Sequence, residues 1–351
     1  MEITIANRIA RISMNRLLSV ALAAACAAGT TSATAAPLTA TQVLNQLNVV
    51  ALNTIDSTSH VDGRTWAGGS VNGGDYGQHL AQAPASAYAG LSVGGAASNL
   101  HVNGGGAVVN GSISNATINS GEAFVKGGAS STNFNGPAYV AGPSAWNNYN
   151  GGHVTTPTAA MQSAGGAASS TNFKQVLTGL STSLNGLAAT GSTVAVSGNK
   201  AVFNAKAGAN GVAVFDLETI DEGLFSLGEF EFHLNGASSV IFNTDVTSAS
   251  INANFLGGAA PLIGGKAVWN FYNATSLTLG SQFGGAVLAT GATLTNWQNV
   301  EGGVFVKNLV QRGEIHLQPF TGTISAVPEP AGVTLLLGGL AVLAARRRWR
   351  G

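Results

Sequence analysis

Very short apolar alternations, separated by glycine or asparagine, are the feature that most restricts how this chain folds. Segments of three to six residues, with apolar side chains at every second position, recur from residue 91 to residue 317. This period-two pattern predicts many short β-strands. Adjacent pairs of glycines supply the positive φ angles that tight corners require. Examples stand at 68/69, 94/95, 127/128, 257/258, 264/265, 284/285 and 302/303.

We therefore predict a mainly β domain over residues 36–325, an irregular right-handed β-solenoid of the β-helix type. Valine, phenylalanine, isoleucine and leucine would point inward from its stacked rungs. No strict repeat length emerges from the sequence, which excludes a regular hexapeptide coil. A β-sandwich is the alternative arrangement of the same strands.

Two segments depart from the strand pattern and predict helices. Apolar residues at i, i+3, i+4, i+7, i+11 and i+14 place one apolar face on a helix over residues 173–187, expected along the solenoid flank. Gly179 and Gly186 weaken this helix by about 1 kcal/mol each relative to alanine, so packing must stabilise it. A shorter helix is expected over residues 39–47, and residues 143–170 are predicted to form an exposed loop.

Composition excludes several classes of protein. Charged residues are 9% of the chain, and disorder would require high charge with low hydrophobicity. Residues 36–330 contain eight basic side chains, namely Arg64, Arg312 and six lysines, against fourteen acidic ones, which gives a net charge of −6. Nucleic acid is therefore not an expected partner, because phosphate binding requires a basic patch.

The amino-terminal region has the layout of an export signal. Three arginines precede the apolar residues 17–28, and a small-x-small cleavage pattern follows at Ala33 and Ala35. We therefore expect residues 1–35 to be a signal peptide. The one cysteine of the chain lies inside this segment, so the mature protein is expected to fold without disulfides or a cysteine-ligated metal.

The carboxyl end consists of three parts in a fixed order. The first is Val327, Pro328, Glu329 and Pro330, where two prolines keep the chain extended around a glutamate. The 15 residues 331–345 carry no charge and would span about 22 Å as a helix. A cluster of arginines follows and predicts that this end of the segment stays on the cytoplasmic side of the membrane. It consists of Arg346, Arg347, Arg348 and Arg350.

This order, over residues 326–351, resembles the PEP-CTERM sorting signal of Gram-negative bacteria. The resemblance implies secretion by the general route and transient anchoring in the inner membrane by a C-terminal transmembrane helix. It further implies processing near Glu329 by an exosortase-type membrane protease, in a bacterium that makes exopolysaccharide and biofilm.

The domain between these ends resembles the choice-of-anchor A family. The sequence SHVDGRTWAGG at 59–69 is similar to its opening motif, AVWNFY at 267–272 to its Trp-Asn-Phe strand, and 284–322 to its closing segment. Proteins of that family carry alternative surface anchors and are regarded as adhesins. The resemblance implies a solenoid-like adhesive domain without catalytic residues. Its motif positions, expected to be structural, are Asp62, Gly63, Arg64, Gly68, Gly69, Trp269, Asn270, Glu314, His316, Phe320 and Gly322.

The histidines do not indicate a metal site. They are scattered without the short spacings that zinc sites show, and only convergence of distant rungs would bring them together. We therefore expect no metal and no cofactor. Glu314 and His316 share one strand face and are expected to be solvated or to cap a terminal rung. The histidines are His60, His79, His101, His153, His233 and His316.

Other polar residues also have structural interpretations. Glu229 and Glu231 share a strand face, which is typical of polar-out alternation and not of a glycosidase pair facing across a cleft. Thr293 and Thr295 form a single Thr-x-Thr, whereas ice-binding solenoids repeat this pattern over many rungs. Arg64 is expected to be partly buried near the solenoid cap, bonded to a carboxylate or to backbone carbonyls.

These features predict a non-enzymatic protein of the cell surface or extracellular matrix. Its polar face would make weak multivalent contacts with exopolysaccharide or with neighbouring cells. One alternative is a carbohydrate-active enzyme on a β-helix scaffold, which acids converging on one groove would favour. The other is an ice-binding or structural coat protein, which a flat threonine ladder would favour.

Overall fold

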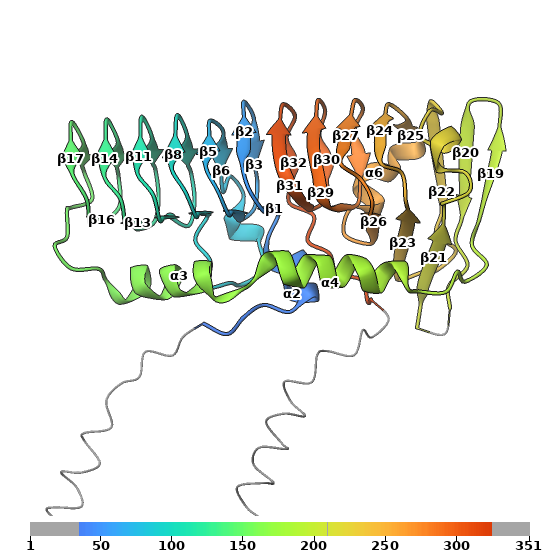
Figure 1. Ribbon diagram of the computed structural model, residues 1–351, viewed down its shortest axis with the longest axis horizontal. Helices are drawn as coiled ribbons and strands as arrows, with labels where there is room; N and C mark the ends of the chain where they lie inside the picture. Colours follow the sequence, from blue (N-terminus) through green and yellow to red (C-terminus); the bar gives the residue numbers. More distant parts are fainter. Residues whose placement is uncertain (1–34, 209, 325–351) are drawn as a thin grey trace, which may run out of the picture. The chain divides into compact units, whose positions relative to one another are not determined.

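The computed structural model describes residues 35–208 and 210–324, which form a long stack of β-rungs with helices along one side (Figure 1). The prediction of a mainly β, solenoid-like fold is confirmed, and the strands do not form a sandwich. Ala33, the segment Val327 to Pro330, residues 331–345 and the closing arginines lie outside the described residues. Within the described ranges, no helix combines the length and the apolar character needed to cross a membrane.

Successive strands of the chain belong to three faces. The helix-covered face consists, along the stack, of β16 (Ala138–Val140), β13 (Ala123–Val125), β10 (Ala107–Val109), β7 (Leu91–Val93), β4 (Thr65–Ala67), β1 (Val49–Ala51), β31 (Val304–Gln311), β29 (Ala286–Asn296), β26 (Ala267–Phe271), β23 (Ser239–Thr244) and β21 (Val212–Asp216).

The second face, named here the hydroxyl face, includes the later residues of the long strands β31 and β29. Its other strands are β17 (Ser144–Ala145), β14 (Ala129–Ser130), β11 (Ile113–Ser114), β8 (Ala97–Ser98), β5 (Val71–Asn72), β2 (Ile55–Ser57), β27 (Ser276–Leu279) and β24 (Ser248–Ile251).

The third face consists of two sheets. Its nine-stranded sheet contains β18 (Asn148–Tyr149), β15 (Asn133–Phe134), β12 (Thr117–Ile118), β9 (His101–Val102), β6 (Asp75–Tyr76), β3 (His60–Val61), β32 (Ile315–His316), β30 (Val300–Glu301) and β28 (Phe283–Gly284). The four-stranded sheet contains β19 (Thr193–Ser197), β20 (Lys200–Asn204), β22 (Glu229–His233) and β25 (Asn254–Phe255), and its β19–β20 pair is antiparallel.

The chain enters the stack in the middle. From β1 it builds rungs toward one end, and α3 (Ala159–Ser170) and α4 (Phe173–Asn185) then run back along the stack (Figure 1). From β19 it builds rungs inward from the opposite end. The last rung pairs in parallel with the first on all three faces, through Val49–Val304, Ile55–Leu309 and Val61–Ile315.

The inward side chains form a continuous apolar core that changes character along the stack. Alanine, valine and isoleucine predominate in the rungs between β1 and β16, where Tyr76 and Phe134 are the fully buried aromatic residues, whereas aromatic rings predominate in the other half. The rings of Phe242 and Trp269 stack with their centroids 3.9 Å apart, and Trp269 Nε1 donates a hydrogen bond to the Gly284 carbonyl at 2.9 Å. Contacts between large aromatic rings therefore fill the interior of this half of the stack.

A nearly constant rung length is present where the sequence shows no obvious repeat. Leu91 pairs with Ala107 and Ala107 with Ala123, each 16 residues further on, and Ala138 follows after 15. Residues 77–90 interrupt this spacing with an insertion that includes the 3₁₀ turn η1 (Leu80–Gln82). Different apolar residue types occupy the equivalent inward positions of successive rungs. The structural repeat is therefore not visible as a repeat of residue identities.

The helix predicted from Phe173 is confirmed as α4. Asn172 caps it, since its side chain accepts a hydrogen bond from the Gln175 amide at 3.1 Å. The apolar side of α4 packs on outward side chains of the helix-covered face such as Val268 and Leu288. Its buried members are Phe173, Leu177, Leu180 and Leu184, with Val176 and Leu187 partly buried beside them.

The shorter predicted helix is also confirmed as α2 (Ala40–Gln46). Thr39 and Gln42 form a capping box at its start, which satisfies backbone donors that the first turn would leave unpaired. Two further short helices, α5 (Asp221–Leu224) and α6 (Ala259–Ile263, preceded by η2, Leu256–Gly258), lie between strands of the second half.

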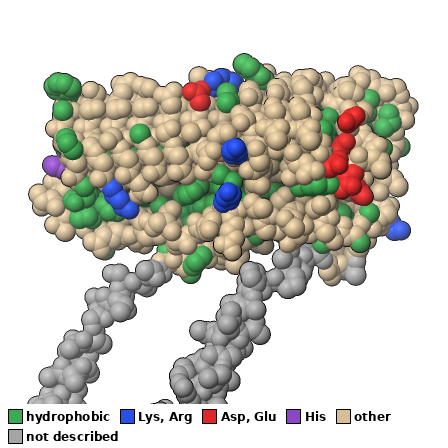
Figure 2. Space-filling view, in the orientation of Figure 1, with side chains coloured by type: hydrophobic (Ala, Val, Ile, Leu, Met, Phe, Trp, Pro, Cys, Tyr) green, Lys and Arg blue, Asp and Glu red, His purple; other side chains and the backbone are tan. Residues whose placement is uncertain are grey.

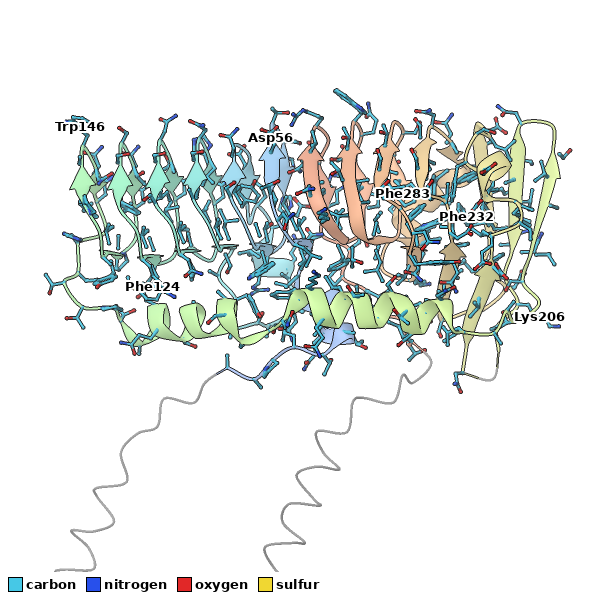
Figure 3. The ribbon with its side chains drawn as sticks, in the orientation of Figure 1. Asp56, Phe124, Trp146, Lys206, Phe232 and Phe283 are labelled. Atoms are coloured by element: carbon cyan, nitrogen blue, oxygen red, sulfur yellow. The ribbon has the colours of Figure 1, made fainter. Side chains whose placement is uncertain are left out.

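The prediction of an exposed loop over residues 143–170 is wrong. The segment contains the end rung, with β17 and β18, and then the whole of α3. Helix α3 consists almost entirely of small residues, so it has little of the apolar periodicity that predicts a helix from sequence. These small residues let it approach the sheet closely, and Gly165 packs against the ring of Phe124 (Figure 3).

The adjacent glycines of α3 provide a test of this packing. A Cβ added at Gly165 would lie 2.6 Å from Cε1 of Phe124, whereas one added at Gly166 would meet nothing within 4 Å. Gly165→Ala should therefore destabilise the domain by about 1–2 kcal/mol. Gly166→Ala should stabilise it by up to about 1 kcal/mol, because alanine favours helix. Thermal unfolding measures both, and shifts of the same sign would contradict the packing.

An ion pair joins the first and last rungs on the hydroxyl face. Arg312 Nη2 lies 2.7 Å from Asp56 Oδ1, and Arg312 Nη1 donates to the Asp56 carbonyl at 3.2 Å. The hydrogen bond from Arg312, with a smaller contribution from Asn72, lowers the pKa of Asp56 below its ordinary value. A lowered folded-state pKa means that the pair stabilises the fold above the ordinary carboxyl pKa and that this contribution is lost as pH falls through the folded-state pKa.

Asp56→Asn should therefore lower the stability at pH 7 by no more than about 1 kcal/mol, since the side chains are partly exposed and solvent screens the pair. The difference from the unaltered chain should shrink steadily as the pH is lowered below about 4. Chemical denaturation at several pH values measures this. A difference that stays constant at all pH values would show that charge is not the cause.

Candidate functional site

The hydroxyl face carries two rows of side chains that point away from the core. Its strands are paired in parallel and in register, so equivalent positions of successive rungs stand side by side, about 4.8 Å apart. The first row is Ser248, Ser276, Thr293, Asn308, Thr54, Ser70, Ala96, Ser112, Gly128 and Pro143. The second row is Ser250, Thr278, Thr295, Val310, Asp56, Asn72, Ser98, Ser114, Ser130 and Ala145.

Three consecutive rungs present hydroxyl groups in both rows. In the sequence, only Thr293 and Thr295 form a recognisable Thr-x-Thr. It remains the one Thr-x-Thr of the two rows, but serines and one threonine on β24 and β27 continue the array of hydroxyl groups. Equivalent positions are separated first by 28 residues, from 248 to 276, and then by 17, which hides the array from a search for a repeat.

Hydrogen bonds between neighbouring rungs hold these side chains in place. Thr54 Oγ1 donates to Asn308 Oδ1 at 3.2 Å, and Asn308 Nδ2 donates to Thr293 Oγ1 at 3.1 Å. Ser98 Oγ likewise donates to Asn72 Oδ1 at 3.2 Å. Asp56 is the one acidic residue in the two rows, and Arg312 neutralises it. The surface is thus polar, ordered and without net charge.

A row of residues with positive φ forms the corner between the hydroxyl face and the third face. Asn99, Asn115, Ser131 and Trp146 occupy it, with φ of 57°, 49°, 49° and 54°. Asparagine tolerates this conformation, whereas a bulky side chain adopts it rarely. The ring of Trp146 is 86% exposed and projects from the end rung (Figure 3). Its strained backbone indicates a site of functional interest.

The third face begins with a ladder of asparagines at the same end of the stack. Asn150 donates to Asn135 at 2.8 Å, Asn135 to Asn119 at 3.3 Å and Asn119 to Asn103 at 2.6 Å. Each amide donates to one neighbour and accepts from the next, so the ladder leaves regular amide groups on the surface.

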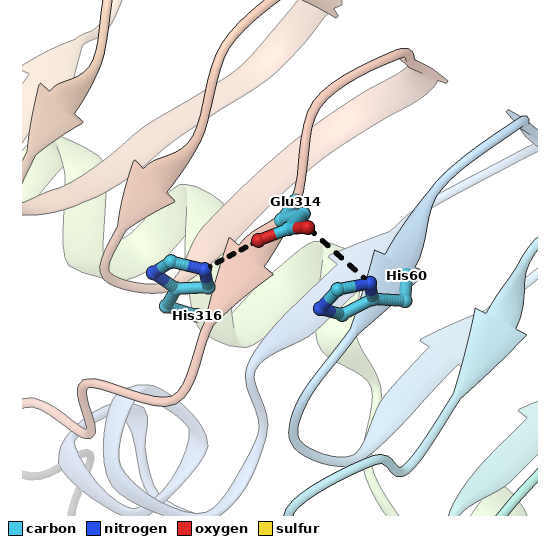
Figure 4. Close-up of side chains that lie close together, drawn as sticks. All are labelled: His60, Glu314 and His316. Atoms are coloured by element: carbon cyan, nitrogen blue, oxygen red, sulfur yellow. Dashed lines mark hydrogen bonds and ion pairs between the residues drawn. The ribbon is translucent and has the colours of Figure 1, made fainter.

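Ionisable side chains replace the asparagines in the middle of the third face, where the last rung meets the first (Figure 4). Nε2 of His316 lies 2.8 Å from Oε2 of Glu314, and Nδ1 of His316 lies 2.8 Å from Oε1 of Glu301. Burial alone lowers the pKa of His316, but the hydrogen bonds and charges of these carboxylates outweigh it and raise the pKa.

The sequence correctly placed Glu314 and His316 on one strand face. They do not lie in a terminal rung, however, because β32 lies between β30 and β3. His60 of β3 lies 3.7 Å from Glu314 and 3.6 Å from the buried Asp62, and His79 Nδ1 lies 2.8 Å from Asp62 Oδ1. The expectation of scattered histidines thus holds along the sequence and fails in space for His60, His79 and His316.

The glycines of the opening motif permit close contact between rungs. A Cβ at Gly63 would lie 2.7 Å from Cβ of Asn48, and one at Gly68 would lie 2.3 Å from the Leu52 carbonyl oxygen. Gly69 is equally restricted. Asn48 was not predicted from any sequence motif; it is buried and donates to the carbonyls of Gly302 and His316, both at 3.1 Å.

Arg64 donates hydrogen bonds to backbone carbonyls, as predicted for one of the two arginines in residues 36–330. Nη1 donates to Pro84 at 2.7 Å and Nε to Tyr88 at 3.1 Å, and burial lowers the pKa of the guanidinium. Arg64 directly precedes β4, which lies between β1 and β7, so the expected place near a solenoid cap is wrong.

The remaining motif residues are structural parts of the core. Trp269 points inward, whereas the buried Asn270 donates to the Ser181 carbonyl of α4 and to Asn243 Oδ1, both at 2.9 Å. Phe320 is buried beneath the helices, and a Cβ at Gly322 would lie 2.5 Å from Cβ of Ser239.

The predicted polar-out pattern of β22 is present. Phe230 is buried, and Phe232 packs against the same core. Glu231 is paired with Lys200 and His233, each at 2.8 Å, which accounts for its charge.

Acidic side chains also gather near the end of the stack formed by β21 and β23 (Figure 2). Desolvation, followed by the charges of Asp221 and Glu218, raises the pKa of Asp245 there. A separate cavity of about 180 Å³ lies between α3 and the helix-covered face, and Glu122 is the one acidic residue in its lining.

Comparison with known protein families identifies the domain. No curated protein and no solved structure matches the chain significantly. Residues 40–317, from α2 to the last rung, match the family described as "Putative Ice-binding-like adhesive domain". An adhesive domain of this kind is typical of surface or extracellular proteins. With most of its length matched, the chain belongs to the ice-binding-like adhesive domain family.

Proposed function

We propose that this chain is a non-enzymatic adhesin of the bacterial cell surface or extracellular matrix, and that the hydroxyl face is its adhesive surface. The observation that carries the proposal is a pair of rows in register over ten rungs, in which fourteen of the twenty positions carry a hydroxyl or amide side chain. Each hydrogen bond to a ligand replaces one to water and contributes little. Repetition along the stack makes the sum of such contacts effective.

The chemistry of this face fits a hydroxyl-rich polymer such as exopolysaccharide. Sugar hydroxyls both donate and accept hydrogen bonds, as do serine, threonine and asparagine side chains. The absence of net charge in the two rows fits a neutral polymer, and the acidic remainder of the domain disfavours nucleic acid. Trp146 and Trp297 are 86% and 56% exposed near the corners of this face, where their rings suit the apolar side of a sugar.

The arrangement of carboxylates supports a non-enzymatic role. Glycoside hydrolysis requires two carboxyl groups that face each other across the scissile bond. Glu231 is occupied by Lys200 and His233, and the cavity beside α3 contains one carboxylate. A carbohydrate-active enzyme on this scaffold is therefore the weaker alternative.

Ice binding is the alternative that a specific observation favours. The hydroxyls of β24, β27 and β29 form a flat array in two rows, a pattern suited to ordered water, and the family description itself refers to ice binding. Four rungs carry hydroxyls in both rows: the three consecutive rungs of β24, β27 and β29, and the separate rung of Ser112 and Ser114. Between these two groups, Asn, Asp, Val and Ala interrupt the array.

A lysine in the hydroxyl array distinguishes these functions. Thr278→Lys places bulk and charge at the centre of the array, and we expect it to weaken binding to the host polysaccharide at least about tenfold, or about 1.4 kcal/mol. Thr117→Lys makes the same change on β12 of the third face and should leave binding unaltered. Binding to immobilised polysaccharide is measured with melting temperature as the folding control.

Equal losses in both variants would contradict the assignment of the hydroxyl face. Inhibition of ice recrystallisation that Thr278→Lys abolishes, with no polysaccharide binding by the unaltered chain, would favour ice binding instead.

The resemblances at the two ends of the chain support an export route for this adhesin. We propose that residues 1–35 direct secretion, that the C-terminal segment holds the chain transiently in the inner membrane, and that an exosortase-type protease cleaves near Glu329. The choice-of-anchor A resemblance agrees with this route, since that family carries alternative surface anchors. The processed domain then reaches the cell surface or the exopolysaccharide matrix of a Gram-negative bacterium.

Intact mass and localisation in the native host test the route. The unaltered protein should end near residue 329 outside the inner membrane, whereas Glu329→Ala should stay full-length in that membrane. Glu222→Ala removes an exposed acid of the domain and should be processed normally. Retention of the C-terminal segment by the unaltered protein would show that the tail is an anchor and not a sorting signal.

A further inference from the structure

Two histidines and a glutamate from opposite ends of the described chain converge on the third face (Figure 4). His60 lies on β3, whereas Glu314 and His316 belong to the last rung at β32, which pairs in parallel with β3. One nitrogen or oxygen from each residue lies within 4.8 Å of the other two. The pairing of the first and last rungs therefore assembles three donor atoms that are remote in sequence.

These donors match the preference of zinc and related ions. Imidazole nitrogen and carboxylate oxygen are ligands for divalent transition metals, and two histidines with one glutamate form a known three-ligand set. Bonds of about 2.0–2.2 Å place ligand atoms of a tetrahedral site about 3.4 Å apart. Oε1 of Glu314 lies 3.7 Å from Nδ1 of His60, and Oε2 of Glu314 lies 2.8 Å from Nε2 of His316. These two distances are slightly longer and slightly shorter than the tetrahedral value.

A second carboxylate faces the other nitrogen of each histidine. Nδ1 of His316 lies 2.8 Å from Glu301, and Nε2 of His60 lies 3.6 Å from Asp62. Both carboxylates are buried, with side chains 6% and 8% exposed. Outer carboxylates in this position orient the imidazole rings and raise their basicity toward a metal.

The carboxylates around the three donor residues have no lysine or arginine partner among the described residues. Oδ1 of Asp62 accepts no hydrogen bond of good geometry, although it lies 2.8 Å from His79 Nδ1. Asp62, Glu301 and Glu314 form ion pairs only with histidines among the described residues. With neutral imidazoles, the charges of the buried Asp62 and Glu301 and of the partly exposed Glu314 therefore remain without a fixed cation. Buried charge is costly unless it is paired or coordinates a metal.

We propose that His60, Glu314 and His316 bind one divalent transition-metal ion of the zinc type, with water at the remaining coordination position. The ion fastens the first rung to the last, and so holds together the two halves of the stack at their junction. It stabilises the folded domain because the unfolded chain does not bring these residues together. The site is separate from the hydroxyl face and does not depend on the proposed adhesive function.

The test uses the full-length chain without a histidine tag, stripped with EDTA and titrated with ZnCl₂. Native mass spectrometry should count one zinc ion per chain, and the melting temperature should rise by several degrees as zinc is added. CoCl₂ in place of zinc should give the visible absorption bands of four-coordinate cobalt, a signature that hydrogen bonding alone does not produce.

Two variants and a control assign the ligands. Glu314→Gln keeps the size of the side chain but removes its charge, and His60→Ala removes one imidazole. Each should weaken zinc binding at least about tenfold and abolish the cobalt bands. His233→Gln changes a histidine that lies 2.8 Å from Glu231 outside the cluster, and it should bind zinc like the unaltered chain.

The proposal is overturned if the stripped chain binds no zinc at micromolar concentration. It is also overturned if Glu314→Gln binds zinc as tightly as the unaltered chain, or if His233→Gln loses binding to the same extent. Should His60→Ala fail to fold, Glu314→Gln decides the matter alone. In any of the overturning outcomes, the cluster is a network of hydrogen bonds that seals the junction without a metal.

Discussion

The parallel pairing of the last rung with the first is the interaction on which the rest of this structure depends. Without it, each half of the stack would leave an unpaired strand edge in the middle of the domain. Hydrogen bonds and ion pairs connect the first and last rungs inside the stack and on two of its faces. Asn48 joins the segments from within, Arg312 joins Asp56 on the hydroxyl face, and Glu314 faces His60 on the third face.

The return path of the chain decides which faces meet solvent. Because the chain builds its first half outward from the middle, it must traverse the stack before it can build the second half. Helices α3 and α4 make this traverse and bury the outward apolar side chains of one face. The other two faces keep polar outward rows, so the same topology that closes the stack also leaves a long hydroxyl face open for binding.

Local sequence patterns predicted most of the strands and helices, but they predicted little of how these elements pack together. Alternation identified strands such as β10 and β31, and apolar spacing identified α4, because each signal lies within one segment. Helix α3 was not predicted, because its small residues form a helix without an apolar stripe. The hydroxyl array was not predicted, because Ser276 and Thr293 become neighbours only through the register of β27 with β29. Glu314 and His316 were visible as an i, i+2 pair, but nothing in their spacing indicated His60.

Local residue patterns alone specify a glycine-rich chain of short strands, low in charge, with an apolar interior and one long amphipathic helix. These properties follow from residue type and local period, which act over a few neighbours. No local pattern specifies that the last rung lies beside the first, which depends on the path of the whole chain. Parallel register then aligned the serine and threonine rows and brought His60 to Glu314, because backbone hydrogen bonding between rungs fixes which distant side chains share a surface.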